Sequence, residues 1–537
     1  MVSWIWRASR YFCAIALVCI GLWVTSCSQR FTTPQQSFIT QNNSQITDFI
    51  PRQALIATVL APDDILPKQT SFLGNRVLEQ LDDLLISLDI NLRDEVFPWL
   101  GSHIALAITD HSLNPSNHNA QRVGYLLVAD ISDSERLREV LELFWQHQSV
   151  AGSKLSFTRA NGVPIISGPI NQTFHQLSTA IVGDHTLIIG NSIQIVRQSL
   201  RVAQTPKLQL SGPDCCVPFW LTLRIPAVID WLGVAAPDEP SLLENQYWQQ
   251  LTAVAEPNSQ GITLKTQLTN LGAQVSTSIT EFEAGAQNVS LQKYLPNSMA
   301  WVAIGNDLTS WWMEKLQIEL NHYQKLPSFL QQAQQWRTTE LGKKLTNPLG
   351  ELLANDYGIG QLDDGAWLMV TSPADPRVAH QLDTIATEEG LTVSQFTLDG
   401  HTVTAWSRLK TKLYQGNLNR ETTVETDLLA LRTNVDAGCY VFATSLSSLT
   451  AALAAPEQPL LLTQRFQRVM QTIDPKHPAY IYGTWNEMER LLNRNRWFSL
   501  VQPIVKPWVQ SIDAIAFTSD VHTKHQSTGT ISVLLKR

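Results

Sequence analysis

The sequence is short of cysteine and of charge, and each shortage excludes a class of protein. Six of its 537 residues are cysteine, far below the share of about 8% that marks disulfide-held scaffolds. Charged residues make up 16% of the chain, against roughly a quarter in an average protein. The formal net charge is −8 and no run of lysine and arginine occurs, so the chain lacks the basic surface that nucleic acids require. We therefore predict no nucleic-acid partner and a fold held by its hydrophobic cores.

The chain also lacks the motifs of common enzyme and cofactor sites. It contains no glycine-rich phosphate loop, no Gly-x-Ser-x-Gly turn and no His-Glu-x-x-His helix. His522 and His525 have metal-like spacing but fall in a predicted polar loop, so we interpret them as surface residues. The pairs Asp63-Asp64 and Asp363-Asp364 lie beside proline or glycine, where aspartate favours turns. We predict no catalytic residues, no cofactor and no metal.

Residues 1–27 have the layout of an export signal. Two arginines precede an apolar stretch of 14 residues, Tyr11 to Val24, which is shorter than the ~20 residues of a membrane-spanning helix. Val24-Thr25-Ser26-Cys27 resembles the lipobox of bacterial lipoproteins, which implies cleavage before Cys27 and lipidation of that residue. Each acyl CH₂ that enters the membrane contributes about 0.8 kcal/mol to anchoring. An ordinary cleaved signal or an uncleaved anchor helix is the alternative.

Three cysteines remain in the predicted folded body. An odd number in an oxidising compartment leaves at least one of Cys215, Cys216 and Cys439 without an intramolecular partner. Adjacent Cys215 and Cys216 do not bridge each other easily. Cys439 could in principle be a nucleophile, but at the start of a predicted strand we interpret it as a small core residue.

A strand–turn–helix pattern occurs twice and predicts two related halves. Gly124 to Trp145 reads GYLLVADISDSERLREVLELFW, and Gly365 to Ala386 reads GAWLMVTSPADPRVAHQLDTIA. An ungapped alignment places Leu127 against Leu368 and predicts that Ser134 and Asp375 cap the two helices. The matched core-facing stripes are Leu137, Leu141, Phe144 and Trp145 in one helix, and Val378, Leu382, Ile385 and Ala386 in the other.

Each half then contains a predicted hairpin and a second capped helix. Asn161-Gly162 and Asp399-Gly400 favour two-residue turns in which both residues adopt positive φ. Asn191 and Ser445 are the predicted caps of the second helices. Because hairpins occur beside strand–helix pairs, we predict an α+β fold: two divergent copies of a mixed or antiparallel sheet with helices packed on one face.

These features predict the organisation of the whole chain. A signal peptide covers 1–26, and the lipidated Cys27 begins a flexible tether over 27–48. The first α+β repeat covers 49–285, a linker 286–293, and the second repeat 294–537. The protein is expected to be exported and anchored on the periplasmic side of a membrane through Cys27, its one predicted site residue.

The length, the lipoprotein-like start and the segment Phe97-Pro98-Trp99-Leu100-Gly101 after a proline-led apolar strand together resemble one family. It is the largely cyanobacterial family of unknown function catalogued as domain of unknown function 3352. The resemblance implies no activity and carries over no functional residues. A cyanobacterial host would place the protein in the periplasm.

Our first functional hypothesis is a membrane-tethered, non-enzymatic binding or assembly protein. Its partners would be the membrane, through the lipid anchor, and a protein or lipid that the sequence does not identify. The alternative is an envelope hydrolase with a site between the two halves. A third hypothesis is a spacer of the envelope that binds no ligand.

Overall fold

The computed structural model describes the strands and helices that form the body of the chain. The described residues are 46–61, 92–110, 123–170, 176–212, 219–232, 249–258, 260–269, 289–306, 344, 348, 350–352, 354–372, 376–415, 420–435, 439–473, 479–493, 511–522 and 526–536. The predicted signal peptide with Cys27, and Asp63-Asp64, Cys215, Cys216, Asp375 and His525, lie outside these residues.

Strands dominate the described structure. Twenty of them are assigned to one sheet, and every pairing for which the register is defined is antiparallel. The predicted fold of two separate α+β sheets is therefore wrong. Side-chain periodicity identifies strands, whereas backbone hydrogen bonds at strand edges decide which strands share a sheet.

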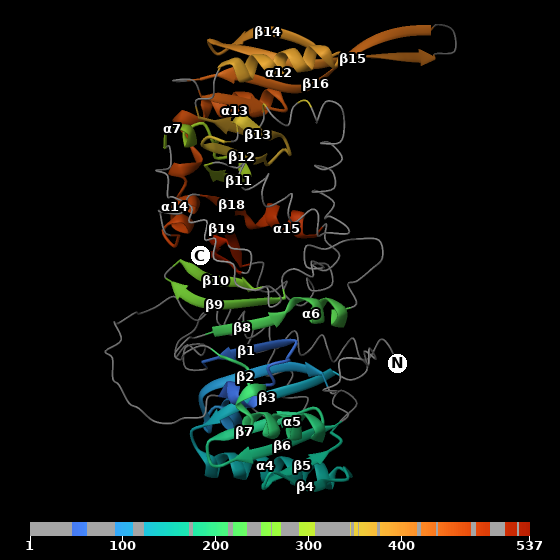
Figure 1. Cartoon of the computed structure of the whole chain (residues 1–537), viewed down its shortest axis with the longest axis vertical. Coiled ribbons are helices and arrows are strands. Elements are labelled where there is room, and N and C mark those ends of the chain that lie inside the picture. The colour runs from blue at the N-terminus through green and yellow to red at the C-terminus, as the bar shows by residue number, and fades with distance from the viewer. Residues whose placement is uncertain are drawn as a thin grey trace. The chain divides into compact units, whose positions relative to one another are not determined.

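The chain divides into two compact units. Unit 1 lies within Met1–Val234, Trp248–Gln274 and Arg496–Ser511, and unit 2 within Ala235–Tyr247, Val275–Asn495 and Ile512–Arg537. Figure 1 labels most of the strands and the α-helices of both units.

The described part of unit 1 contains ten strands, which pair in an order different from their order in the chain. In order of pairing they are β4 (Ser156–Ala160), β5 (Val163–Gly168), β6 (Leu177–Val182), β7 (Thr186–Gly190), β3 (Val123–Ile131), β2 (Leu100–Asp110), β1 (Ile56–Leu60), β8 (Phe219–Arg224), β9 (Gln250–Asn258) and β10 (Gly261–Thr269). Its described helices are η1 (Ile46–Phe49), η2 (Leu92–Val96), α4 (Ser134–Val150), α5 (Ile193–Ala203), η3 (Pro206–Leu208) and α6 (Ile225–Leu232).

Unit 2 repeats this pairing pattern strand for strand. In order of pairing its strands are β14 (Thr392–Leu398), β15 (His401–Gln415), β16 (Arg420–Asn434), β17 (Tyr440–Ala443), β13 (Trp367–Thr371), β12 (Tyr357–Leu362), β11 (Met299–Gly305), β18 (Tyr480–Thr484), β19 (Ile512–His522) and β20 (Gln526–Leu535). Its described helices are α7 (Val289–Gln292), α12 (Pro376–Glu388), α13 (Leu446–Ala454), η6 (Ala455–Glu457), η7 (Leu460–Leu462), α14 (Gln464–Met470) and α15 (Trp485–Asn493).

Unit 1 has a hydrophobic core on each face of its sheet. Ile195 and Leu200 of α5 pack with Val128 on one face. Leu137 of α4 packs with Ala129, the next residue of β3, on the other face. Successive residues of a strand point to opposite faces, so the two helices cover opposite sides. The prediction that helices pack on one face is wrong for this unit.

Unit 2 is built in the same way. Leu449 of α13 and Phe466 of α14 pack in one core with Val441 of β17. Leu382 of α12 packs in another core with Phe442, the next residue of that strand. All four residues of β17 are consequently buried, as expected for a strand covered on both faces.

The predicted turns are confirmed, and two of the predicted helix caps are displaced by one residue. Asn161 and Asp399 have φ of 51° and 47°, each followed by a glycine with positive φ, and both join adjacent antiparallel strands. Ser445 caps α13 as predicted, in a capping box with Ser448. The cap of α4 is Asp133 instead of Ser134. The cap of α5 is Ser192 instead of Asn191.

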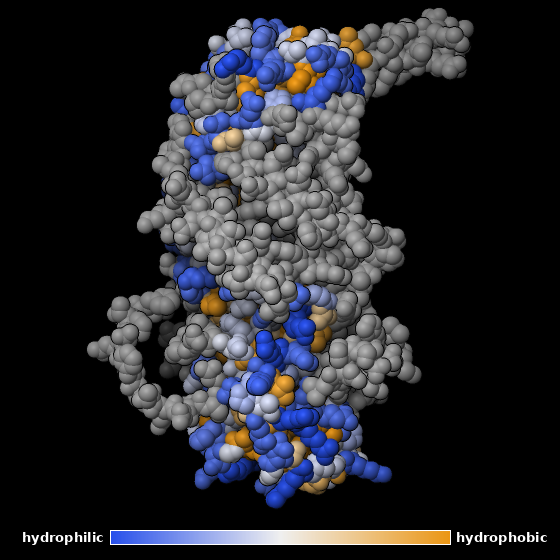
Figure 2. Space-filling view, in the orientation of Figure 1, coloured by the Kyte–Doolittle hydropathy of each residue, from blue (hydrophilic) through white to orange (hydrophobic). Residues whose placement is uncertain are grey.

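The described surface is mainly polar, and one pair of strands extends beyond its neighbour. Among the residues that Figure 2 colours, hydrophilic ones predominate and apolar ones occur singly or in small groups. In unit 2, β15 and β16 continue past β14 as a two-stranded ribbon (Figure 1), because β14 pairs only with the first seven residues of β15, His401 to Ser407.

Candidate functional site

A hollow of about 550 Å³ lies beside α12 in unit 2. Its lining residues come from α12 and from positions 344–351, which precede β12. They are Lys344, Pro348, Glu351, Arg377, His380, Gln381, Thr384 and Ile385. The lining combines cationic, amide and hydroxyl groups with one carboxylate.

Helix geometry explains why polar residues of α12 reach this hollow. Leu382 and Val378 are buried, and both pack with Leu352 on the sheet side of the helix. Residues three and four positions apart share a helix face, so Arg377, Gln381 and Thr384 form a separate stripe. All three are exposed. The amphipathic pattern that buries one side of α12 thus places polar groups along its other side.

An ion pair holds α12 against the sheet. Arg432 of β16 donates from its Nε to Oδ1 of Asp383 at 3.0 Å and pairs with Oδ2 through its second nitrogen. The indole nitrogen of Trp406 donates to the same Oδ1 at 2.8 Å. The two charged side chains are only 13% and 15% exposed. Because this network fixes Asp383, it also fixes the position of its neighbours on the helix.

A second charge network closes one end of the hollow. Nζ of Lys344 lies 2.7 Å from Oε1 of Glu389 and 3.6 Å from Oε2 of Glu388. The hydrogen bond with Glu389 is the main reason that the pKa of Lys344 lies above its ordinary value. Lys344 is therefore a fixed positive charge that is already engaged by carboxylates.

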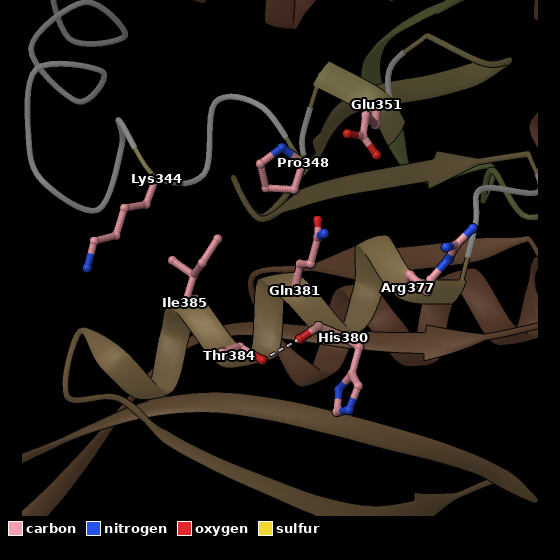
Figure 3. A pocket seen from close by; sticks show the side chains of 8 residues that line it. All are labelled: Lys344, Pro348, Glu351, Arg377, His380, Gln381, Thr384 and Ile385. Atoms are coloured by element: carbon pink, nitrogen blue, oxygen red, sulfur yellow. Dashed lines mark hydrogen bonds between the residues drawn. The ribbon is translucent and has the colours of Figure 1, made fainter.

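The side chains are arranged for binding through hydrogen bonds. Figure 3 shows Gln381 and Ile385 pointing toward Pro348, and the ring of His380 leaving the helix on another side. The Thr384 hydroxyl donates to the backbone carbonyl of His380 at 3.0 Å. Lys344 and Arg377 stand at opposite ends, with Glu351 above the helix (Figure 3). The hollow thus combines two cationic side chains and one carboxylate with uncharged polar groups.

A further cluster of charged residues lies in unit 2, where β12, α14, α15 and β19 begin or end. Nε of Arg465 lies 2.9 Å from Oδ1 of Asp513, and Glu487 pairs with Arg490. Burial, followed by repulsion from Glu487, raises the pKa of Asp363. Burial raises the pKa of Tyr482 to about 12. The cations of this cluster are matched by carboxylates of the same unit, which is the pattern of a structural network.

Unit 1 contains a histidine–aspartate pair at an irregularity of β2. Nδ1 of His103 lies 3.0 Å from Oδ2 of Asp130, and each side chain is about one-third exposed (35% and 30%). The register of β2 on β3 shifts between Leu100 and Ile104. A Cβ on Gly101 would lie 2.7 Å from Cβ of Asp130, so glycine allows the bulged strand to approach β3 this closely.

The other residues singled out in the sequence fall within the framework. Cys439 is 3% exposed in the hydrophobic core of unit 2, as expected for a core residue. Asp364 accepts the Ala366 backbone N–H at 2.9 Å and forms part of the turn between β12 and β13. The prediction that His522 lies in a loop is wrong, because His522 is the last residue of strand β19.

Sequence reasoning missed the hollow, although one signal for it was present. Arg377, Gln381 and Thr384 recur at helical spacing beside the predicted core stripe of α12. A polar stripe of this kind is the ordinary surface of an amphipathic helix. Only the residues at 344–351, which face it, turn it into a hollow.

The described residues lack two further features. No cluster of three or more histidine, cysteine, aspartate or glutamate side chains suited to a metal ion occurs in the part of the chain that the structure describes. No helix among those residues is both long enough and apolar enough to cross a membrane.

The fold and the hollow define a protein built on an antiparallel sheet, with helices on both faces of each unit and a small polar recess. The chain belongs to the family described as protein of unknown function DUF3352, whose model matches residues 12–536. No curated protein matches the chain. Two crystal forms of TP0453, forms I and IV, are similar to it at 8% identity and a TM-score of 0.25. The matches cover 44% and 42% of this chain and 82% and 79% of those chains. A TM-score this low indicates neither a shared fold nor a shared function.

Proposed function

We propose that the protein is exported, anchored to a membrane through a lipidated Cys27, and acts there as a non-enzymatic binding or assembly factor. The observation that carries the proposal is the N-terminal sequence, in which a 14-residue apolar stretch from Tyr11 to Val24 leads directly into Thr25-Ser26-Cys27. Several acyl chains on one residue are enough for stable attachment. The partner is a membrane component or an envelope protein, and not a nucleic acid.

The hollow beside α12 supports binding as the activity of the anchored protein. Its carboxylate, amide, hydroxyl and cationic side chains offer both hydrogen-bond donors and acceptors to a ligand, and the ion pair of Asp383 with Arg432 holds α12 in place. A preorganised polar recess of this size accommodates a small molecule or a side chain of a partner.

We further propose that units 1 and 2 arose by internal duplication. Each pairing defined among β1–β10 has a counterpart among β11–β20, from the hairpin β4–β5 with β14–β15 to the closing pair β9–β10 with β19–β20. The two-residue turns at Asn161-Gly162 and Asp399-Gly400 occupy matching places in this pattern. Two unrelated chains have no physical reason to share every one of these features.

The test of the anchor is a Cys27→Ser substitution followed by membrane fractionation in a bacterial host that lipidates proteins. The unchanged chain should sediment with membranes and incorporate labelled fatty acid. The variant should lose the label and move to the soluble fraction. A Ser26→Ala control, which preserves a small residue before the cysteine, should behave like the unchanged chain. A variant that remains in the membrane with an unaltered mass would contradict the proposal.

An envelope hydrolase is the second candidate, and one observation favours it, although it lies within unit 1 and not at the predicted site between the two halves. A carboxylate that holds a histidine, as Asp130 holds His103 at 3.0 Å, is the arrangement that orients a general base in many hydrolases. A panel of ester and peptide substrates separates the candidates. Turnover that His103→Ala abolishes would support the hydrolase, whereas the binding proposal predicts the same background with both proteins.

A further inference from the structure

Strand β14 is an exposed edge of the sheet. Its seven residues pair only with β15 among the described strands, without a register shift, from Thr392 opposite Ser407 to Leu398 opposite His401. Five of the seven residues are exposed, and the other two are half-buried. The strand therefore presents one row of backbone N–H and C=O groups to its surroundings.

The composition of β14 is unusual for an exposed edge. Its sequence, TVSQFTL, contains no charge and no proline, although natural proteins use lysine, proline, bulges or short strands to prevent edge pairing. The corresponding edge strand of unit 1, β4, is shorter and carries Arg159. The edge of β4 is thus protected where that of β14 is not.

The direction of the unpaired backbone groups follows from the hairpin. In a two-residue turn, Leu398 and His401 form a hydrogen-bonded pair. Alternate residues of an antiparallel strand bond to the same side. The outward groups are therefore those of Val393, Gln395 and Thr397, which are centred on Gln395.

We propose that β14 pairs antiparallel with β14 of a second copy of this chain, about a two-fold axis at Gln395, and so joins two sheets into one. In that register Gln395 lies opposite Gln395 of the other copy, and Val393 lies opposite Thr397. The outward backbone groups of both strands then meet as hydrogen-bonded pairs. A two-fold interface requires a self-complementary strand, and an uncharged strand places no like charges opposite each other.

The exposed aromatic residue of β14 favours a second copy over an unrelated peptide. Phe396 is 39% exposed and is among the exposed large hydrophobic residues of the described chain. Self-pairing about Gln395 makes the two Phe396 residues diagonal neighbours, at roughly 7–8 Å, which is within reach of aromatic side chains. Both rings lose exposed surface in this pairing.

The test is the mass of the purified full chain in detergent, measured by chromatography with light scattering over a range of concentrations. After subtraction of detergent, a mass twice that of one chain is expected; one chain has 60.1 kDa with residues 1–26 present and less after their removal. Gln395→Lys places two positive charges directly opposite each other, and Gln395→Pro removes an N–H that bonds only to the other copy. Each change should raise the dissociation constant at least about tenfold.

Matched controls separate pairing from folding. Ser156→Lys adds the same charge to the exposed edge of β4 and should leave the dimer unchanged. Both Gln395 variants should keep the circular dichroism and melting temperature of the monomer, since edge strands accept lysine and proline. A monomeric unchanged chain at about 100 µM would overturn the proposal. So would a dimer that both folded Gln395 variants retain.

Discussion

Single charged residues in unit 2 hold its helices against the sheet. Asp383 of α12 accepts hydrogen bonds from both Arg432 and Trp406, and its side chain is 13% exposed. A carboxylate so far removed from water is stable only while its partners remain. The pair therefore links the position of α12, and with it the hollow, to two neighbouring strands, β15 and β16.

Replacing Arg432 should destabilise the folded state more than most substitutions near the surface. Arg432→Met leaves Asp383 largely buried with a single indole donor, and we expect a loss of about 3 kcal/mol in the free energy of unfolding. The double variant Asp383→Leu, Arg432→Met removes both charges and should lose less than the single variant. Urea denaturation followed by tryptophan fluorescence measures both. Equal losses would show that the pair contributes packing and not charge compensation.

Asp363 should make stability depend on pH. Burial and the charge of Glu487 raise its pKa in the folded state above the reference value of 3.8. The folded state thus holds the proton more tightly than the unfolded state. The stability contributed by this group is present below pH 3.8 and is lost as the pH rises through the folded pKa.

The corresponding variant is Asp363→Asn. It should melt at a higher temperature than the unchanged chain at pH 7, and the difference should shrink as the pH falls toward 3.8. Glu457→Gln removes one negative charge from an exposed side chain and serves as the control. A difference in melting temperature that does not vary with pH, or that grows on acidification, would rule out the titration of Asp363 as its cause.

At the scale of elements, the cap of α4 is the most direct test of the structure against sequence reasoning. The Asp133 side chain accepts the backbone N–H of Arg136 at 3.0 Å. Asp133→Ala should lower the free energy of unfolding by about 1 kcal/mol. Ser134→Ala should be neutral or slightly stabilising, because position 134 lies inside the helix. Thermal melts of both variants distinguish the two residues, and the reverse order would restore Ser134 as the cap.

Much of the local structure could be predicted from the sequence. Short-range chemistry specifies the turns at Asn161-Gly162 and Asp399-Gly400 and the buried stripe of α12, and the structure contains all three. The ungapped alignment of the two strand–helix units failed by one residue within the strands. Leu126 packs on the α5 face of unit 1, and Leu127, which had been aligned with Leu368, lies on the other face. A slip of one residue reverses the face. Only four of the 22 aligned positions of 124–145 and 365–386 are identical, which is too few to detect such a slip.

At the scale of the whole molecule, the pairing of strands that are distant in the chain could not be predicted from the sequence. The strands of each half were recognisable, but nothing in their periodicity indicated that β3 would lie between β2 and β7, or that Phe442 and Val441 would enter different cores. The hollow escaped for the same reason, since Glu351 and Arg377 are brought together only by the folding of β12 and α12. The local sequence pattern determines single helices and strands. The contacts between distant elements depend on which strand edges pair and on how side-chain volumes fit together, and no short segment specifies either.

The proposed membrane anchor depends on the chemical state of the N-terminus. Mass spectrometry of the protein extracted from membranes measures that state directly. We predict an N-terminal residue Cys27 carrying diacylglycerol, with residues 1–26 absent. A chain that begins at Met1, or one that begins after residue 27 and carries no lipid, would contradict the proposed anchor and the function that rests on it.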